Sequence, residues 1–460
     1  MFPEAPWAQP IAGAPRGPDS TVPSPRRGGQ GGDAPFTVPT ASREAIWAGM
    51  ARAPSSPLAR PAAAATDLAA GRRLLAVLVL ATALGPFAMQ VFLPALPAIQ
   101  AGFASSPAAA QLAFSLSTLA IAFATLIYGP LSDRVGRRPA LLGGLLVYLL
   151  GTALCALAPD LELLILGRIV QAAGGCAGMV LSRAIVRDLF PRERAAEALA
   201  WITMAMVVAP MAAPALGGLL VDLWGWRSIF LLGFLAGAAV LLACRAALVE
   251  TARPGATGGG SATLLGAFAI LLRHRGFQGY ALQAACSMAV FFGFLAAAPF
   301  LVVETYRRPA VEYGLFFVMV SGAFMAGNFA AARLSARLGS ERMILLGSAG
   351  SLAASATALA LALGGVWTPL ALFLPTAAGG FAQGLAMPNA QAAIVSVHPG
   401  LAGSAAGLAG FLQMATAALA AQLVGSLATG SPVPVTFAMT LCAGSALLGA
   451  WYGRGAGEAR

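Results

Sequence analysis

One short segment of the chain, GPLSDRVGRR at residues 129–138, concentrates charge in a sequence that contains little of it. Only 10% of the 460 residues are charged, yet one acid and three arginines fall within six positions: Asp133, Arg134, Arg137 and Arg138. Gly129 and Gly136 permit a tight turn here. We expect the acid to accept hydrogen bonds from backbone donors at a neighbouring helix N-terminus, or from an arginine, in one conformation of the protein. A simple topological anchor explains the arginines, but neither Asp133 nor the glycine spacing.

A second candidate site lies inside an apolar run. Arg168 follows about seven residues after the start of a run at residue 161, which places it roughly 10 Å deep. Because an arginine in lipid costs at least about 2.5–3.5 kcal/mol, its side chain is expected to face a cavity or a partner; the alternative is a side chain that extends outward to the surface. Gln90 lies at nearly the same depth in another run, so we expect its carbonyl to accept a hydrogen bond from Arg168. Gln171 is a further candidate for this site.

The elements that carry these residues are long apolar runs in a chain that is 58% hydrophobic. Twelve runs are near the length of a bilayer span, at about 74–96, 110–131, 139–157, 161–184, 196–221, 228–249, 277–303, 312–334, 343–363, 369–390, 401–428 and 432–452. Helices satisfy their own backbone groups in lipid, and the short alternating segments of a β-barrel do not occur. The predicted fold class is all-α integral membrane, with twelve transmembrane helices in two six-helix bundles.

The distribution of arginine supports this count. The chain contains no lysine, and 24 of its 28 basic residues fall in alternate segments, which we take as cytoplasmic together with both termini. The other alternate loops hold only Arg227, Arg307 and Arg308. The net charge of +11 is therefore explained by membrane topology, and no nucleic-acid partner is expected.

Composition divides the chain into five parts. Residues 1–70 are rich in Pro, Gly, Ala and Arg and are expected to form a disordered cytosolic extension, although Met50 is an alternative start. The predicted bundles span 74–249 and 277–452, joined by a cytosolic linker at 250–276 that ends in an amphipathic stretch. A short tail follows at 453–460.

The two halves carry a faint repeat. LSDRVGRR at 131–138 aligns with LSARLGSE at 334–341, an offset of 203 residues. Paired halves at a fixed offset are typical of transporters built from two bundles around a central site.

The segment at 129–138 resembles the loop between helices 2 and 3 of the major facilitator superfamily, through the residues Gly129, Leu131, Asp133, Arg134, Gly136, Arg137 and Arg138. In that family the loop is implied to latch the two halves and to gate alternating access. Further segments are similar to the Bcr/CflA drug-resistance subfamily, among them FLPALPAIQ, GRIVQAAGGCAGMVLSRAIVRD and APMAAPALGGLLVDLWGWRSIF. The resemblance runs from about residue 74 to 452 and implies drug:proton antiport, with the proton gradient as energy source and no cofactor.

The chain departs from that subfamily at Gln90, where many relatives carry an aspartate. A glutamine does not titrate, and no predicted span interior contains Asp, Glu or His. Asp133 or Glu304 are the candidates left to carry a proton, and an acidic substrate that neutralises Arg168 is the other alternative. We expect Gln90 to make the site less suited to cations than the sites of relatives.

Two further groups of residues are candidates by position. Helix 5 carries residues that flex a helix or allow close packing, in the manner of the antiporter motif of efflux proteins: Pro210, Pro214, Gly217 and Gly218. Aromatic and amide side chains in later runs are candidates for the wall of a substrate cavity: Phe291, Phe292, Asn328, Gln383 and Asn389. Generic packing of small residues and ordinary lipid-facing positions are the alternatives.

The sequence predicts a monomeric secondary transporter of a bacterial inner membrane that exports small amphipathic compounds. An uptake or metabolite-export permease of the same fold is the alternative. An enzyme or a metal site is disfavoured because the five cysteines are scattered without a C-x-x-C, and no catalytic constellation lies within the spans. A nucleotide-driven pump is disfavoured because a chain without lysine lacks the phosphate-binding loop. A channel would need a ring of like residues along a pore.

Overall fold

The computed structural model describes residues 60–190, 192–251, 264–427 and 430–455. Residues 1–59 of the predicted extension, residues 252–263 of the predicted linker and residues 456–460 of the tail lie outside this part. The described elements are helical: α2 (Arg60–Phe92), η1 (Leu93–Ala95), α3 (Leu96–Gly102), α4 (Pro107–Val135), α5 (Arg137–Ala156), α6 (Leu161–Leu189), α7 (Arg192–Trp224), α8 (Arg227–Ala247), α9 (Leu264–Arg273), α10 (Arg275–Phe300), the π-helical turn η2 (Leu301–Thr305), α11 (Ala310–Leu338), α12 (Ser340–Leu363), α13 (Pro369–Ser396), η3 (Pro399–Leu401), α14 (Ala402–Ser426) and α15 (Val433–Gly453).

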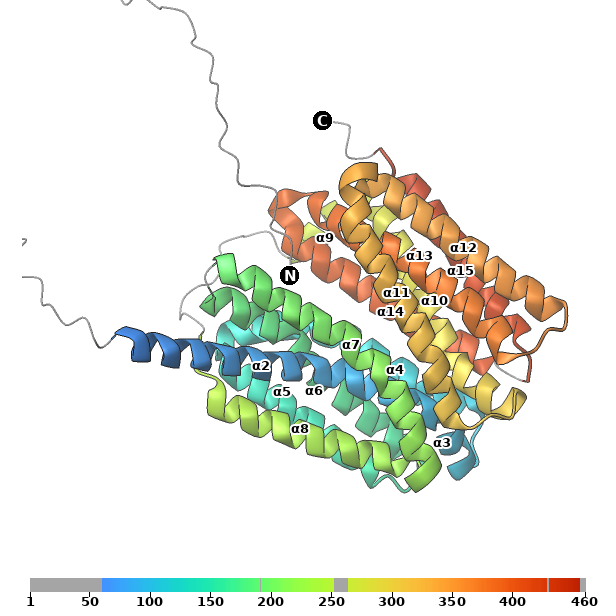
Figure 1. Ribbon diagram of the computed structural model, residues 1–460, viewed down its shortest axis with the longest axis horizontal. Helices are drawn as coiled ribbons and strands as arrows, with labels where there is room; N and C mark the ends of the chain where they lie inside the picture. Colours follow the sequence, from blue (N-terminus) through green and yellow to red (C-terminus); the bar gives the residue numbers. More distant parts are fainter. Residues whose placement is uncertain (1–59, 191, 252–263, 428–429, 456–460) are drawn as a thin grey trace, which may run out of the picture. The chain divides into compact units, whose positions relative to one another are not determined.

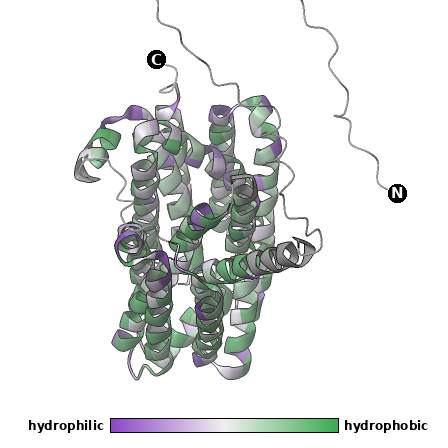
Figure 2. Ribbon diagram, turned by 90° about the vertical axis from the view of Figure 1, so that its left-hand side faces the viewer, coloured by the Kyte–Doolittle hydropathy of each residue, from purple (hydrophilic) through white to green (hydrophobic). Residues whose placement is uncertain are grey.

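Twelve helical segments of the described residues are long and apolar enough to cross a membrane, which confirms the predicted number of spans. Hydrophobic residues cover most of the length of these helices (Figure 2). Large apolar side chains such as Leu80, Ile127 and Leu150 are more than half exposed, at 54%, 58% and 58%. An apolar surface that extends over so many helices is stable where lipid replaces water.

Helix ends follow local sequence signals. Ser106, Asp160 and Thr368 each cap a helix by accepting a hydrogen bond from the backbone N–H three residues later. Gly136 and Gly339, which are 203 residues apart, have φ angles of 100° and 81° and join two helices without a longer loop. The predicted repeat between the halves is therefore present in the backbone.

The first six spans and the last six spans form separate bundles (Figure 1). In the first bundle α6 packs against α4 and α5, and α5 packs against α8. In the second bundle α13 packs against α11 and α12, and α10 against α14 and α15. The bundles meet along two helix pairs, α4 with α14 and α7 with α11.

Two local expectations differ from the structure. Helix α2 begins at Arg60, so residues 60–70 of the predicted extension are helical, as their alanine-rich sequence favours. Helix α4 continues to Val135, so most of the segment 129–138 is helical and Gly129 is a helix residue with open space beside it. The turn that the glycines were expected to make together is made by Gly136 alone. The amphipathic stretch of the linker is the short helix α9, which packs against α10 and α14.

Candidate functional site

Arg168 lies two turns into α6, whose N-terminus is capped by Asp160. Helix α6 comes close to α5 through glycines on both sides: a side chain at Gly151 or Gly174 would collide with the backbone of the facing helix. This close packing buries the inward face of α6, so Arg168 is only 2% exposed and Gln171 is also 2% exposed. The predicted interior position of the arginine is thus what the structure shows.

The contacts of Arg168 come from neutral groups. One guanidinium nitrogen donates to Oε1 of Gln171 at 2.5 Å and to the carbonyl of Ala88 at 3.4 Å. The guanidinium carbon lies 4.0 Å from the centre of the Phe92 ring, as in a cation–π contact. Gln171 in turn donates to the hydroxyl of Thr152 at 2.8 Å, so both ends of its amide are occupied. Nε of Arg168 has no hydrogen-bond partner among the described residues.

Gln90 does not bond to Arg168, and the predicted pairing of these two side chains is wrong. Gln90 is buried, but its Oε1 has no hydrogen-bond partner within the described structure. The reason is the helical period: Ala88 and Phe92, four residues apart, share the face of α2 that meets Arg168. Residue 90 is rotated about 200° from residue 88, so an equal depth in the membrane does not place it on the same side.

Glu304 also lies away from this site. It occupies η2, the last turn of the seventh span, and its side chain is exposed near the start of α11. Its sequence position at a span end is what places it there. The candidate group of Gln90, Arg168, Gln171 and Glu304 is therefore reduced to the pair of Arg168 and Gln171.

A cavity of the first bundle adjoins this pair. Its wall is mostly apolar, with a few polar groups: Gly85, Ala88, Met89, Ser117, Ile121, Tyr148, Arg168, Gln171, Ala172, Cys176 and Met179. We call it the N-bundle cavity.

The second bundle also contains a cavity, and none of its wall residues is charged. The wall is formed by Val290, Phe291, Phe294, Val320, Ala354, Ser355, Ala358, Pro375, Thr376, Gly379, Gly380, Gln383 and Met439. Two of the five predicted cavity residues, Phe291 and Gln383, line it. Phe292 instead stacks on Phe114 of the first bundle, with ring centres 5.8 Å apart.

The two remaining cavity candidates bond to their own helices. Asn328 donates to the carbonyl of Phe324 and Asn389 to that of Leu385, each four residues earlier. An amide side chain in a helix has such a carbonyl within reach, and the sequence alone does not show that it will take it.

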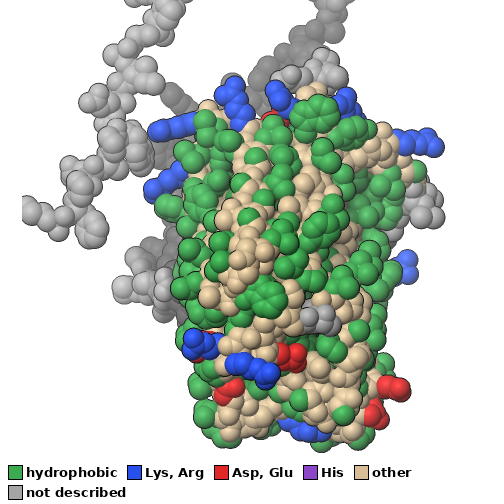
Figure 3. Space-filling model, turned by 90° about the vertical axis from the view of Figure 1, so that its right-hand side faces the viewer, with side chains coloured by type: hydrophobic (Ala, Val, Ile, Leu, Met, Phe, Trp, Pro, Cys, Tyr) green, Lys and Arg blue, Asp and Glu red, His purple; other side chains and the backbone are tan. Residues whose placement is uncertain are grey.

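One end of the bundles carries most of the described arginines, and we call it the arginine-rich end: Arg134, Arg137, Arg138, Arg183, Arg187, Arg245, Arg273, Arg275, Arg333, Arg337, Arg342 and Arg454. Basic side chains gather at the top of the face shown in Figure 3, above a broad hydrophobic surface. The other end, which we call the opposite end, carries Arg227, Arg307 and Arg308.

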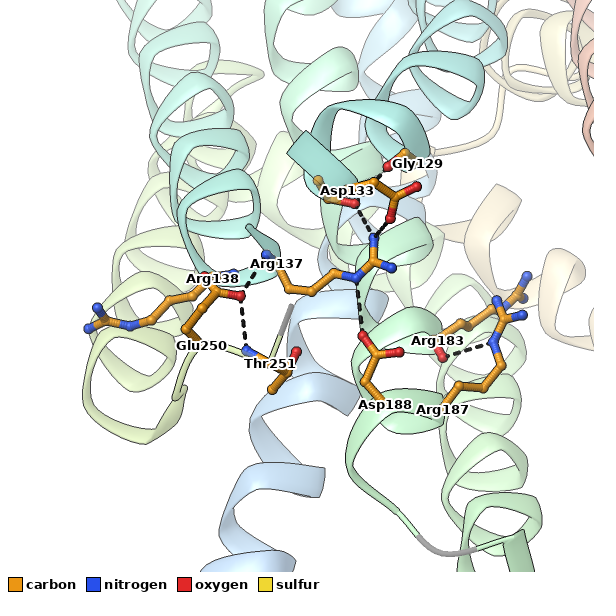
Figure 4. Close-up of polar contacts among 10 residues, drawn as sticks. Gly129, Asp133, Arg137, Arg138, Arg183, Arg187, Asp188, Glu250 and Thr251 are labelled. Carbon is orange, nitrogen blue, oxygen red and sulfur yellow. Dashed lines mark hydrogen bonds and ion pairs between the residues drawn. The ribbon is translucent and has the colours of Figure 1, made fainter. Parts of the chain in front are cut away.

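At the arginine-rich end, Arg137 connects the predicted motif to α6 (Figure 4). Its guanidinium lies 2.6 Å from a carboxylate oxygen of Asp133 and 3.1 Å from one of Asp188, and it also donates to the hydroxyl of Ser132. Of the two partners expected for Asp133, the structure therefore has the arginine.

A different acid, Glu250, occupies the N-terminus of α5. Its carboxylate accepts from the backbone N–H groups of Arg137 at 2.9 Å and Arg138 at 3.2 Å (Figure 4). A Cβ at Gly136 would lie 2.5 Å from this carboxylate, so the glycine gives Glu250 room. Sequence analysis missed Glu250 and Asp188, which lie 113 and 51 residues from Arg137.

At the opposite end the bundles are joined directly. Gln422 of α14 accepts from the hydroxyl of Ser115 at 2.6 Å and donates to the carbonyl of Ala108 at 3.0 Å, both in α4. Asp222 of α7 accepts from the backbone N–H of Val311 in α11 at 3.0 Å. These three are the hydrogen bonds between the bundles in the described part of the chain. We call this region the seam.

Glycines bring the helices of the seam together. A Cβ at Gly218 would lie 2.6 Å from the carbonyl oxygen of Ala310, and one at Gly314 would collide with the backbone of Ala215. The fifth predicted span is α7, and it carries the other candidates of that group. Gly217 faces the backbone of Val91, and the helix continues through both Pro210 and Pro214. Gly314 lies 203 residues after Gln111 of α4, which is the offset of the repeat, and Gln111 also packs at the seam, against Gly425 of α14. The repeat is therefore the sequence signal that relates these two seam positions.

Two six-helix bundles with an interior arginine and a seam at one end define a membrane transporter of the two-bundle class. The model of the Major Facilitator Superfamily matches residues 78–421, and the chain belongs to that family. It is therefore a secondary transporter and not an enzyme.

Relatives include drug-resistance proteins. The chain is 28% identical over 374 residues to the bicyclomycin resistance protein homolog of Haemophilus influenzae, covering 78% of this chain and 90% of that protein. It is 29% identical over 343 residues to multidrug resistance protein D of Escherichia coli, covering 74% and 85%. A chloramphenicol resistance protein of Pseudomonas aeruginosa is 32% identical over 282 residues, covering 60% and 65%. The resemblance to Bcr/CflA-type transporters is confirmed.

Solved structures agree on the fold. An inward-facing bacterial homolog of the human lysosomal transporter Spinster has a TM-score of 0.69 at 15% identity, covering 84% of this chain and 96% of that one. The xylose transporter XylE from Escherichia coli, in a partially occluded inward open conformation, has a TM-score of 0.64 at 12% identity, covering 83% and 96%. At these identities the comparison shows the fold alone.

Proposed function

We propose that this protein exports small amphipathic compounds from the cytoplasm by alternating access. The observation that carries the proposal is the one-sided interface: the hydrogen bonds between the bundles in the described residues all lie in the seam. The charge contacts that the described residues make at the arginine-rich end stay within single bundles. A transporter sealed at one end only is in a state that exchanges substrate with the other side.

The arginine-rich end is proposed to face the cytoplasm. Excess arginine in short loops marks the cytoplasmic side of a membrane protein, and the opposite end holds only three of the described arginines. This orientation puts both termini in the cytoplasm of a bacterium and the seam on the outer side of its inner membrane. The structure then corresponds to an inward-facing state of a monomeric transporter.

The substrate class follows from the relatives and from the two cavities. Relatives are named for resistance to bicyclomycin, to chloramphenicol and to several drugs. Walls of methionine and aromatic residues with a few polar groups suit compounds that are partly apolar. We infer that this chain expels compounds of this kind from the cell.

Energy is proposed to come from the proton gradient, as the resemblance implies. A second candidate function, a permease not coupled through a helix 1 carboxylate, is favoured by one observation. Gln90 stands in the first span, where many proteins of the subfamily carry an aspartate, and no acidic side chain is buried among the residues whose burial the structure describes. Asp133 and Glu304, the other candidates to carry a proton, are exposed.

Everted membrane vesicles test the proposal. Vesicles from cells with and without the gene are given radiolabelled chloramphenicol, bicyclomycin, ethidium or the organic anion 1-naphthoate, with an acid lumen imposed as a pH gradient. We expect gene-dependent accumulation in the lumen that collapses when a protonophore is added. Accumulation that ignores the pH gradient supports the permease instead. If no compound accumulates, the export proposal is wrong.

A further inference from the structure

Arg168 is a buried charge without a counter-charge in the part of the chain that the structure describes. It is the one charged side chain among the buried residues of the described structure, and the described acids are exposed or half-buried at helix ends. None of those acids forms an ion pair with it in the described part of the chain. Burial of an ion is costly unless the ion is both paired and hydrogen-bonded.

The neighbours of Arg168 satisfy it only in part. Gln171 Oε1 and the Ala88 carbonyl are neutral acceptors for one guanidinium nitrogen, and the Phe92 ring covers one face. Nε remains buried with no partner among the described residues. Gln171 is held by Thr152 and presents its oxygen to the arginine, so it positions the guanidinium without neutralising it. A planar guanidinium with free donors matches the two oxygens of a carboxylate.

This charge lies in the wall of the N-bundle cavity, together with apolar side chains such as Met89, Ile121 and Met179. In this state the N-bundle cavity has a volume of about 10 Å³, which is room for about one water molecule. We propose that this cavity widens to bind the anionic group of an amphipathic substrate, with Arg168 as its counter-charge and the apolar wall holding the remainder. The proposal rests on the proposed export function and narrows its substrate class to organic anions. The cavity of the second bundle has no charged residue in its wall, so the anionic group is assigned to the first.

Export of an anion also explains how the chain works without a buried carboxylate. Each monoanion carries one negative charge outward, and a membrane potential that is negative inside favours this movement. The potential sustains a concentration ratio of about 50-fold per 100 mV. A substrate that brings its own charge draws energy from the membrane potential, with no proton bound inside the spans, so for such substrates electrical driving replaces the proton exchange of the proposed function.

A binding panel on the purified full-length protein tests the site. Aromatic carboxylates are compared with their uncharged amides, namely benzoate with benzamide and 1-naphthoate with 1-naphthamide, and chloride is included as an inorganic anion. We expect at least one carboxylate to bind about 10-fold or more tightly than its amide, as a charge-assisted pair should. Arg168→Gln should bring that ratio to within about 2-fold, and Arg168→Lys should keep only part of it, because lysine supplies the charge without the planar pair of donors.

Arg227→Gln is the matched control. Arg227 also stacks on an aromatic ring, that of Trp226 at 4.1 Å, and donates to the carbonyl of Ala158, but it is exposed at the opposite end. The preference of Arg227→Gln for the carboxylate over its amide should equal that of the unmodified protein. Arg168→Gln removes an uncompensated charge, so its unfolding temperature should not fall; if this variant does not fold, the panel on the unmodified protein still decides the question.

Three outcomes overturn the inference: no carboxylate binds more tightly than its amide, Arg168→Gln keeps the preference, or chloride binds and the aromatic carboxylates gain nothing over it. The outcomes for export are separate. A carboxylate preference in a protein that exports nothing from vesicles contradicts the proposed function and leaves the anion site in place. Export of uncharged drugs without any carboxylate preference contradicts the anion site alone.

Discussion

The two ends of the interface between the bundles are held in different ways. The seam at the opposite end joins helices of different bundles through glycine contacts and through hydrogen bonds of Gln422 and Asp222. At the arginine-rich end, the described contacts of Arg137 and Glu250 connect segments of one bundle. In the proposed export cycle, the charges keep a bundle rigid while the seam is the part that has to open. Where a glycine lets two helix backbones touch, the two surfaces pack closely over several residues. These contacts are all lost together when the two helices move apart.

Cys176 provides a reporter for this comparison. It is 1% exposed and lies in the wall of the N-bundle cavity. With the other four cysteines replaced by alanine, its labelling by a membrane-impermeant thiol reagent from either face of the membrane reports which end is open.

The largest effect is expected from Gly314→Leu. A side chain here collides with the backbone at Ala215, so the seam cannot close without displacement of a helix. We expect export to fall by about 10-fold or more, and Cys176 to become reactive from the outer face. Gly322→Leu is the matched control, because this glycine of the same helix has open space around it. Equal loss of export in both variants would remove the special role of the seam.

Arg137→Gln should act on stability rather than on the seam. It leaves Asp133 and Asp188 without their shared cation, at a cost of about 1–2 kcal/mol in the free energy of unfolding because both carboxylates are partly solvated. The thermal unfolding temperature should fall while Cys176 labelling from the outer face stays unchanged. Arg337→Gln is the control, since this exposed arginine near the Gly339 turn of the second half forms no ion pair among the described residues. Faster outer labelling in Arg137→Gln would show that the charges also hold the seam.

Gln422→Leu should weaken the seam without blocking it. The change removes the hydrogen bonds to Ser115 and Ala108, worth together about 1–2 kcal/mol. Labelling of Cys176 from the outer face should rise by about 10-fold, with export reduced less than in Gly314→Leu. Gln391→Leu breaks a comparable bond to Gln413 inside one bundle and should leave labelling unchanged. The assignment fails if the two glutamine variants behave alike.

The smallest effect separates the two repeat turns. Gly136→Ala and Gly339→Ala both place a side chain at a strained positive φ, at a cost of about 1–3 kcal/mol each. Gly136→Ala should cost more, because its Cβ also meets Glu250, whereas Gly339 has open space. The two unfolding temperatures measure this difference. In a protein that also carries Glu250→Ala, the two unfolding temperatures should be equal. If they still differ, the contact with Glu250 is not the cause of the difference.

Much of the architecture was predictable because it depends on periodic patterns along one chain. The lengths of the apolar runs predicted twelve spans. The repeat of LSDRVGRR and LSARLGSE aligns Gly136 with Gly339, and the structure turns between two helices at both glycines. Arg168 was predicted to lie inside because a charge within an apolar run has few other places to go. The partners of these residues were harder to predict. Asp188, Glu250 and Gln422 lie 51, 113 and 307 residues from the groups they contact, and no local pattern connects them.

The sequence by itself determined how deep each residue lies, since depth follows from counting residues at a fixed rise along a helix. Only the tertiary structure decided which way each residue faces. Gln90 and Arg168 lie at similar depths, yet the rotation of α2 against α6 brings Ala88 and Phe92 to the arginine and leaves Gln90 on another side. That rotation is set by the close packing of whole helix faces, such as Gly175 of α6 against Gly85 of α2. It is a property of two helices together, and neither run of residues contains it alone.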